Sequence, residues 1–95
     1  MSYPPAVKVI RWNPKKNEWL KKNRGVCLEQ VAILLEQKNE LDVIDHPNQQ
    51  KYPGQQIAVV EIKNYAYLVP HVETANEMFL KTVIPSRKMT RQYLR

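Results

Sequence analysis

Three apolar runs dominate the second half of the chain, and short polar connections separate them. They read I-A-V-V-E-I, Y-A-Y-L-V-P-H-V-E and M-F-L-K-T-V-I-P, joined by Lys63-Asn64 and by Thr74–Glu77. β-Branched and aromatic runs with connections this short are typical of an antiparallel meander, and Asn64 tolerates the left-handed backbone of a two-residue hairpin loop. We therefore predict three strands, at residues 57–62, 65–73 and 78–85. A helix should follow, with Ser86 as its N-cap.

The lengths of the two connections predict the register of this meander. Ile62 should lie opposite Tyr65, and Glu73 opposite Met78, which makes both faces largely apolar. The first face then comprises Ala58, Val60, Ile62, Tyr65, Tyr67, Val69, His71, Met78, Leu80, Thr82 and Ile84. The second comprises Ile57, Val59, Glu61, Ala66, Leu68, Pro70, Val72, Phe79, Lys81 and Val83. Only the second face brings an acid, Glu61, and a base, Lys81, onto one surface. A single bulge would reverse the assignment for one strand.

The first half of the chain predicts a strand followed by a helix. Residues 6–12 alternate enough for a strand. Asn13-Pro14 is a helix start, because Asn caps free amides and Pro at the first helical position lacks an N–H that would be unpaired anyway. We expect this helix to run to about Asn23, with Trp19 and Leu20 as its apolar stripe and Gly25 as its C-cap. Its opposite face should carry Lys15, Lys16, Lys22 and Asn23.

A second helix is predicted directly after Gly25. Cys27 is in the N-cap position and Gln30 in the capping-box position, while Val26 and Val31 can form a hydrophobic staple. Apolar residues then recur at helical spacing, which predicts a helix that packs on the sheet. A thiolate nucleophile at the helix N-terminus is an alternative role for Cys27, but no histidine lies nearby in the sequence. We favour a small, partly buried residue in place of a hydroxyl cap.

Leu41–His46 alternates as a strand, and its aspartates favour a sheet edge. Pro47–Gln55 reads as a polar loop with Pro and Gly. The predicted fold class is therefore α+β: an antiparallel sheet of four to five strands, with two helices from the first half packed on it and a C-terminal helix. The 95 residues are expected to form one domain, residues 1–95.

Composition narrows the class of protein. An apolar fraction of 43% favours a folded chain, and the single cysteine excludes an internal disulfide and fits a reducing cytoplasm. No run is long and apolar enough to predict a membrane span. One Cys and two His form no recognisable ligand set, so we expect no metal and no cofactor.

Charge is distributed unevenly along the chain. Residues 8–24 hold seven bases and one acid, residues 78–95 hold five bases and no acid, and residues 36–45 hold four acids. With a net charge of +6, two basic segments that exclude acids favour a polyanion-facing surface built from both ends of the chain. The alternative is a pair of ordinary solvated helix faces.

Several local motifs together resemble the BrnT family of type II toxins. They are W-N-P-K-K, N-R-G-V, L-D-V-I-D-H-P and the closing K-T-V-I-P-S-R-K-M-T-R-Q-Y, and the resemblance spans roughly residues 10–94. It implies a RelE-like fold, RNA cleavage without the ribosome, and inhibition by a cognate BrnA-like antitoxin. It further implies a hetero-oligomer with that antitoxin in the cytoplasm, contact with operator DNA only through the antitoxin, and no membrane association.

The closing motif is the most specific part of this resemblance. The family typically reads R-I-I-S-A-R-x-A-T with a Tyr shortly after. Lys81 stands where the family has its first Arg, and Arg87, Thr90 and Tyr93 match the second Arg, the Thr and the Tyr. Two departures concern charged positions: Arg24 replaces the His of the family's K-H-G-V, and residues 55–57 read Q-Q-I where the family has E-x-R.

RNA cleavage by transphosphorylation needs a base, an acid and fixed positive charge around the phosphorane. Arg87 suits the charge role, because it would sit in the first turn of a helix and its planar fork matches phosphate oxygens. Lys81 is close enough in sequence to join the same site. His71, Glu61 and His46 are the candidate acid–base groups; Glu61 is better placed in the predicted register, and His71 has the more suitable intrinsic pKa.

Further contacts with RNA are expected from Arg24, Lys22, Lys88, Arg91 and Tyr93. Each candidate has a structural alternative. Arg87 could neutralise an acid across the sheet, Lys81 could be a polar strand position, His71 could be a buried structural histidine, and Tyr93 could pack the last helix on the core. Two function classes therefore stay open: a metal-independent endoribonuclease toxin, and a non-catalytic module that binds nucleic acid or the antitoxin.

Overall fold

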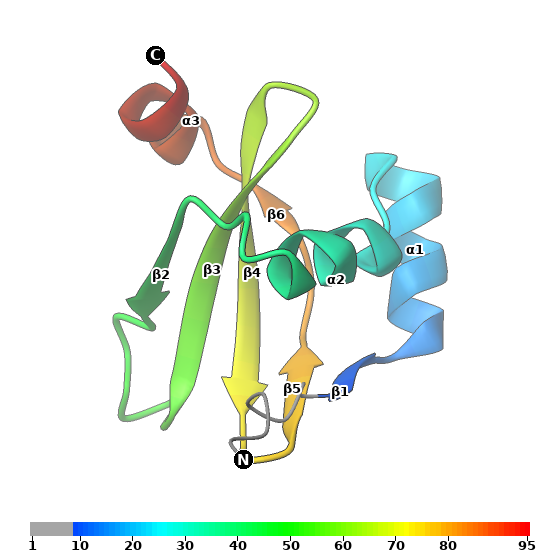
Figure 1. The fold of residues 1–95 in the computed structure, drawn as a ribbon, viewed down its shortest axis with the longest axis vertical. Coiled ribbons are helices and arrows are strands. Elements are labelled where there is room, and N and C mark those ends of the chain that lie inside the picture. The colour runs from blue at the N-terminus through cyan, green and yellow to red at the C-terminus, as the bar shows by residue number, and fades with distance from the viewer. Residues whose placement is uncertain (1–8) are drawn as a thin grey trace, which may run out of the picture.

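The computed structural model describes residues 9–95, which form three helices and six strands. In chain order they are β1 Val9–Trp12, α1 Pro14–Arg24, α2 Leu28–Glu36, β2 Asp42–Asp45, β3 Gln55–Ile62, β4 Tyr65–Glu73, β5 Glu77–Leu80, β6 Ile84–Pro85 and α3 Arg87–Leu94. Five strands lie in the order β1-β5-β4-β3-β2, and β6 pairs with β4 (Figure 1). The α+β class predicted from the sequence is confirmed.

The sheet is mixed, where the sequence predicted an antiparallel one. β1 pairs with β5 in parallel, and the other pairings are antiparallel. Parallel neighbours need a long connection, and the chain between β1 and β5 supplies one, because it contains α1, α2 and the strands β2, β3 and β4. The predicted strand began at Ala6, and residues 6–8 lie outside the described part of the chain. Within residues 9–95, β2 pairs with β3 alone and is an edge strand, as its aspartates indicated.

The predicted meander register is confirmed for β3, β4 and most of β5. Ile62 pairs with Tyr65 and Glu73 with Met78, and both loop residues, Lys63 (φ 53°) and Asn64 (φ 64°), are left-handed. A two-residue hairpin loop with two positive φ angles matches the right-handed twist of its strands.

The predicted strand at residues 78–85 is broken, and this changes which side chains face the core. His71 pairs with Leu80, so an unbroken ladder would place Leu68 opposite Val83; Leu68 instead pairs with Ile84. One extra residue is therefore accommodated between β5 and β6, as in a β-bulge. As a result Val83, predicted on the second face, is fully buried in the core of the first face. Ile84 is 37% exposed.

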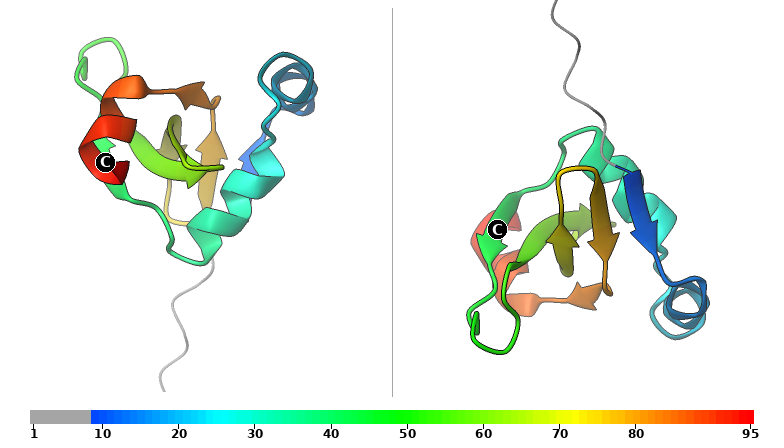
Figure 2. Two further views of the ribbon diagram at one scale, coloured as in Figure 1. Left: turned by 90° about the horizontal axis from the view of Figure 1, so that it is seen from above. Right: turned by 90° about the horizontal axis from the view of Figure 1, so that it is seen from below.

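The main core lies between the first face of the sheet and the helices α1 and α2. Its buried members are Leu20, Val26, Leu28, Val31, Ala58, Val60, Ile62, Val69, Leu80 and Val83. Viewed along the sheet, α2 and α3 lie on opposite sides of the central strands (Figure 2). The second face is therefore partly covered by α3. No helix among residues 9–95 has the length and apolar character needed to cross a membrane.

Helix α1 begins and ends as predicted, but its apolar stripe is narrower. The Asn13 side chain accepts hydrogen bonds from the amides of Lys15 and Lys16, and Gly25 closes the helix at φ 66°. Leu20 is fully buried, whereas Trp19 is 42% exposed, so the prediction that both form the apolar stripe is wrong for Trp19.

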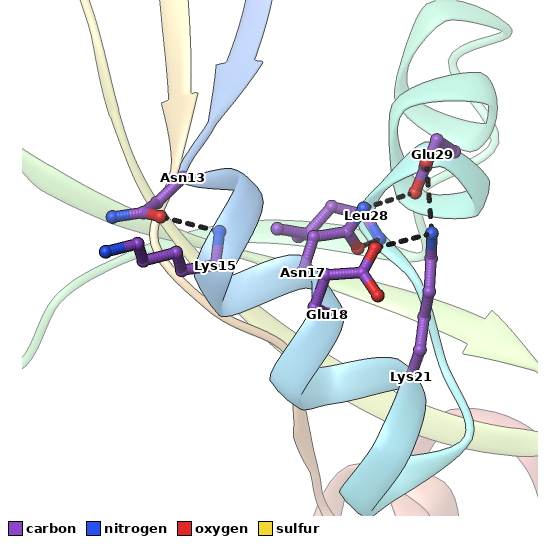
Figure 3. A network of polar contacts seen from close by, with 7 residues as sticks. All are labelled: Asn13, Lys15, Asn17, Glu18, Lys21, Leu28 and Glu29. Atoms are coloured by element: carbon purple, nitrogen blue, oxygen red, sulfur yellow. Dashed lines mark hydrogen bonds and ion pairs between the residues drawn. The ribbon is translucent and has the colours of Figure 1, made fainter.

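The buried polar residue of α1 is Asn17, which holds α2 in place. Its Oδ1 accepts a hydrogen bond from the Leu28 amide (2.7 Å) and its Nδ2 donates to Glu29 Oε1 (2.6 Å), as Figure 3 shows. Asn17 thus satisfies a free amide at the start of α2 from a neighbouring helix. The hydrogen bond from Asn17 is also the main reason why the pKa of Glu29 is lowered. Gln30 accepts from the Cys27 amide, the capping-box contact that the sequence indicated.

Candidate nucleic-acid interface

Helix α3 carries most of the C-terminal basic segment, and the backbone amide and carbonyl of Ala66 in β4 fix its first turn. The amide of Ser86 donates to the carbonyl of Ala66 (2.9 Å), and the amide of Ala66 donates to Thr90 Oγ1 (2.8 Å). The Thr90 hydroxyl in turn donates to the Ser86 carbonyl (2.8 Å), and Ser86 Oγ caps the helix by accepting from the Met89 amide. Thr90 is 2% exposed, so these bonds are shielded from water. They fix the position of the first turn, where Arg87 lies.

The far end of α3 is tied to the edge strand β2. Tyr93 donates its hydroxyl hydrogen to Asp42 Oδ2, and this hydrogen bond is the main cause of the raised pKa of Tyr93. α3 therefore crosses from β4 to β2 over the second face of the sheet. Tyr93 therefore attaches α3 to the sheet, as in the structural alternative to an RNA contact.

A shallow pocket of about 360 Å³ lies beside α3 and is lined by three arginines. Its lining residues are Tyr65, Arg87, Thr90, Arg91 and Arg95. All three arginines are exposed, and no carboxylate among residues 9–95 forms an ion pair with any of them. Arg87 therefore does not neutralise an acid across the sheet. Three unpaired guanidinium groups around one pocket attract an anion and suit phosphate oxygens in particular.

The basic residues of α1 adjoin the segment that leads into α3. Arg24 Nη1 donates to the carbonyl of Val83, and the Arg24 guanidinium carbon lies 4.9 Å from the centre of the Trp19 ring. Lys22 is exposed on α1. In Figure 1 the C-terminal part of α1 and α3 lie at the same end of the molecule, with β6 between them. Arg24 and Val83 are 59 residues apart in sequence, so their hydrogen bond brings the two basic segments together.

Of the four predicted catalytic residues, only Arg87 lines the arginine pocket. His71 is 2% exposed on the helix-covered face, with its Nδ1 2.9 Å from the carbonyl of Val69. Glu61 is exposed but pairs with Ala66, whereas the Lys81 amide bonds to the carbonyl of Pro70, four positions further along β4. Glu61 and Lys81 lie on opposite sides of β4 and, at strand spacing, are separated by roughly 13 Å along it.

Lys81 does not share the pocket of Arg87 either. The amides of Lys81 and Ser86 bond to the carbonyls of Pro70 and Ala66, so the same spacing of roughly 13 Å separates the two segments. The Lys81 ammonium lies 5.5 Å from the centre of the Phe79 ring. The structure therefore does not bring Lys81 and Arg87 to one pocket, because the residues between them are spread along β4.

The remaining predicted residues divide between the two basic segments. Arg91 lines the pocket, while Lys88 is exposed on α3 outside its lining. His46 lies at the end of β2, where its Nδ1 accepts a hydrogen bond from the Asn48 amide and its ring packs 4.4 Å from that of Tyr52. His46 therefore has a local structural role.

Sequence reasoning missed two pocket residues, Tyr65 and Arg95. Tyr65 was placed on the opposite face from Ala66, yet it lies at the hairpin turn, where the sheet ends and α3 begins. The sequence indicated a role for Arg95 only through its place in the basic C-terminal segment. A helix that begins at Arg87 returns to the same side after four and eight residues, so Arg91 and Arg95 follow from helical spacing once the helix start is known.

No cluster of three or more His, Cys, Asp or Glu residues in the described chain could hold a metal ion. Comparison with known proteins adds no relative: no family model, curated protein or solved structure matches this chain.

Proposed function

We propose that this chain is the toxin of a type II toxin–antitoxin pair and cleaves RNA in the cytoplasm without a metal ion. The observation that carries the proposal is the pocket of three unpaired arginines beside α3. The resemblance to BrnT toxins supports it, because Arg87 and Thr90 of the closing motif both line this pocket. A BrnA-like antitoxin would cover the basic surface with complementary charge, in a hetero-oligomer that contacts operator DNA through the antitoxin.

The chemistry proposed for this pocket is transphosphorylation. The 2′-oxygen of the RNA attacks the adjacent phosphorus, the bond to the 5′-oxygen breaks, and a 2′,3′-cyclic phosphate and a 5′-hydroxyl result. Arg87, Arg91 and Arg95 would hold the phosphate oxygens and stabilise the charge that develops on them. The role is electrostatic, because the guanidinium groups keep their protons at any working pH.

Proton transfer in this proposal falls to Tyr65, whose phenol would donate its hydrogen to the departing 5′-oxygen and recover one from the attacking 2′-hydroxyl. Among the five lining residues it is the only one with a titratable phenol, and the Thr90 hydroxyl is engaged with the backbone of Ala66 and Ser86. Tyrosine is among the side chains that act as general acids or bases. The buried His71 and the distant Glu61 have no such access to the pocket.

A specific observation favours a second candidate, a non-catalytic module that binds RNA or the antitoxin. Among residues 9–95, no histidine, aspartate or glutamate lines the arginine pocket. The two candidates share phosphate binding and differ in turnover, so one set of variants separates them.

Arg87→Ala and Arg87→Lys are the test variants, and Arg11→Ala is the matched control. Arg11 is an exposed arginine on β1 that pairs with Glu77, away from the pocket. For an endoribonuclease, Arg87→Ala should slow RNA cleavage in EDTA roughly a hundredfold or more. It should also abolish growth arrest, while Arg11→Ala retains both. Arg87→Lys should rescue little, because lysine keeps the charge but loses the bidentate fork.

Circular dichroism establishes that each variant is folded. A folded Arg87→Ala protein that cleaves at the wild-type rate would remove the pocket from the mechanism. Wild-type protein that binds RNA but leaves it intact would establish the binding module instead. Cleavage that EDTA abolishes and magnesium restores would refute the metal-independent mechanism.

A further inference from the structure

Trp19 is a large apolar side chain that the fold leaves in water. It is 42% exposed on α1, whereas Leu20 next to it is fully buried. Exposed single apolar residues are common, so exposure alone does not indicate a role. What sets Trp19 apart is the ring's surroundings: the Lys16 ammonium lies 4.4 Å from the ring centre, and the Arg24 guanidinium carbon lies 4.9 Å away.

The helix surrounds Trp19 with bases. Its four neighbours on the helix surface, three and four residues before and after it, are Lys15, Lys16, Lys22 and Asn23. Asn23 is itself anchored, because its Nδ2 donates to the Trp19 carbonyl (2.9 Å). No residue among 9–95 forms an ion pair with Lys15, Lys16 or Lys22. The face around the ring therefore presents unpaired positive charge.

The acidic residues near α1 are engaged elsewhere. Lys21 bridges Glu18 and Glu29, with both nitrogen–oxygen distances at 3.5 Å, on the side of α1 that faces α2 (Figure 3). Both carboxylates raise the pKa of Lys21. Glu18 and Glu29 therefore pair with Lys21 on the side of α1 that faces α2, and neither pairs with the lysines around Trp19.

Both cations lie over the ring, so a base must displace one of them to reach it. We propose that Trp19 is a stacking platform for an unpaired base of single-stranded RNA, which displaces the flexible Lys16 side chain while Arg24 stays bonded to Val83. An indole can stack on any base, and flanking cations can hold the adjacent phosphates, the combination that proteins use to bind single strands without reading their sequence. The charge around the ring selects a polyanion over an apolar protein surface.

Arg24 connects this platform to the arginine pocket. Its guanidinium bonds to the carbonyl of Val83, four residues before Arg87, so at most roughly 13 Å of backbone separates that carbonyl from the pocket arginine. A strand whose base stacks on Trp19 can pass residues 83–86 and place a phosphate beside α3. The platform thus identifies single-stranded RNA as the substrate class and deepens the proposed function, on which it rests.

The test uses the full chain and a single-stranded oligouridylate of roughly 12 nucleotides, long enough to cover one such surface. Its riboses carry 2′-O-methyl groups, so binding is measured without cleavage. Trp19→Ala should bind it roughly 5- to 100-fold more weakly, and Trp19→Phe should fall between that variant and the wild type. Tyr52→Ala, which removes an aromatic ring beside Lys51 in the loop before β3, should bind like the wild type.

Two further measurements separate stacking from charge. RNA should quench tryptophan fluorescence in the wild type and leave it unchanged in Trp19→Phe, which retains Trp12. Lys16→Gln should lower the slope of log affinity against log salt by about one, whereas Trp19→Ala should leave the slope unchanged.

The outcomes distinguish this inference from the function on which it rests. Wild-type affinity in Trp19→Ala together with weakened binding in Arg87→Ala would overturn the platform and leave the arginine pocket intact. Loss of antitoxin binding in Trp19→Ala with unchanged RNA affinity would also overturn it, in favour of a protein-docking residue. A wild-type protein with no affinity for RNA would overturn both proposals.

Discussion

Replacing Thr90 with valine removes the hydroxyl that holds α3 and keeps the side chain's shape. Two hydrogen bonds of 2.8 Å are lost, one to Ser86 and one from Ala66. Ala66 is fully buried, so its amide would lose its partner without access to water. A hydrogen bond contributes about 1 kcal/mol net, and an unsatisfied buried donor costs about 1–3 kcal/mol more. The variant should therefore be destabilised by about 2–4 kcal/mol.

Thermal unfolding followed by circular dichroism measures this loss. In a domain of this size each kcal/mol lowers Tm by roughly 4–8 °C, so the expected decrease is on the order of 10–30 °C. Urea titration gives the free energy of unfolding directly, and an unchanged m value would show that the denatured state is unaffected. RNA affinity should decrease too, because Arg87 and Arg91 lie on the helix that Thr90 holds.

Thr82→Val is the matched control for this experiment. Within residues 9–95 the Thr82 hydroxyl oxygen is buried and has no hydrogen-bond partner. Replacing it with a methyl group should therefore be neutral or stabilising, because it removes an unsatisfied polar atom. Equal unfolding temperatures for Thr90→Val and Thr82→Val would show that the Thr90 hydrogen bonds do not hold α3.

Two further variants test contacts between elements. Asn17→Ala should lower the free energy of unfolding by about 1–3 kcal/mol in urea titration, because the buried Leu28 amide and Glu29 both lose a partner; stability equal to the wild type would show that water replaces the cap. Hydrogen bonding to Asp42 raises the pKa of Tyr93, so its contribution is complete below the unfolded pKa of about 10 and is lost as the pH rises through the folded value. Tyr93→Phe should therefore be less stable than the wild type at pH 7, and paired urea titrations should show this difference shrinking as the pH rises above about 10. A difference that stays constant with pH would contradict the linkage.

Much of the fold could be predicted because local rules and tertiary structure agree. Asn13-Pro14, Gly25 and Ser86 each fix a helix end by their own chemistry, and the Lys63-Asn64 loop fixes the register of its hairpin. The bulge before β6 was not predictable in position, because M-F-L-K-T-V-I-P alternates as one strand with no Gly or internal Pro to mark the break. The parallel pairing of β1 with β5 was likewise not predictable, because it depends on how distant segments pack and no local sequence pattern indicates it.

The site was less predictable than the fold, because sequence distance is a poor guide along an extended chain. Lys81 and Arg87 are six residues apart, yet the bulged segment spreads them along β4. Histidine is a common general base, but alternation placed His71 on the face that α1 and α2 bury. Trp19 and Leu20 are adjacent apolar residues, so the sequence predicted that both face the core. The packing of α1 shows that only the side with Asn17 and Leu20 is buried.

The way in which α3 is anchored leaves its arginines available for a ligand. Three polar side chains fix α3 to the rest of the protein. Ser86 caps the helix, Thr90 bonds to Ala66 of β4, and Tyr93 bonds to Asp42 of β2. Arg87, Arg91 and Arg95 form no ion pair within residues 9–95. A helix attached through its neutral residues does not need its cations for stability. Their exposure therefore costs the fold little, and their like charges, which repel one another around one pocket, become favourable only when an anion binds between them.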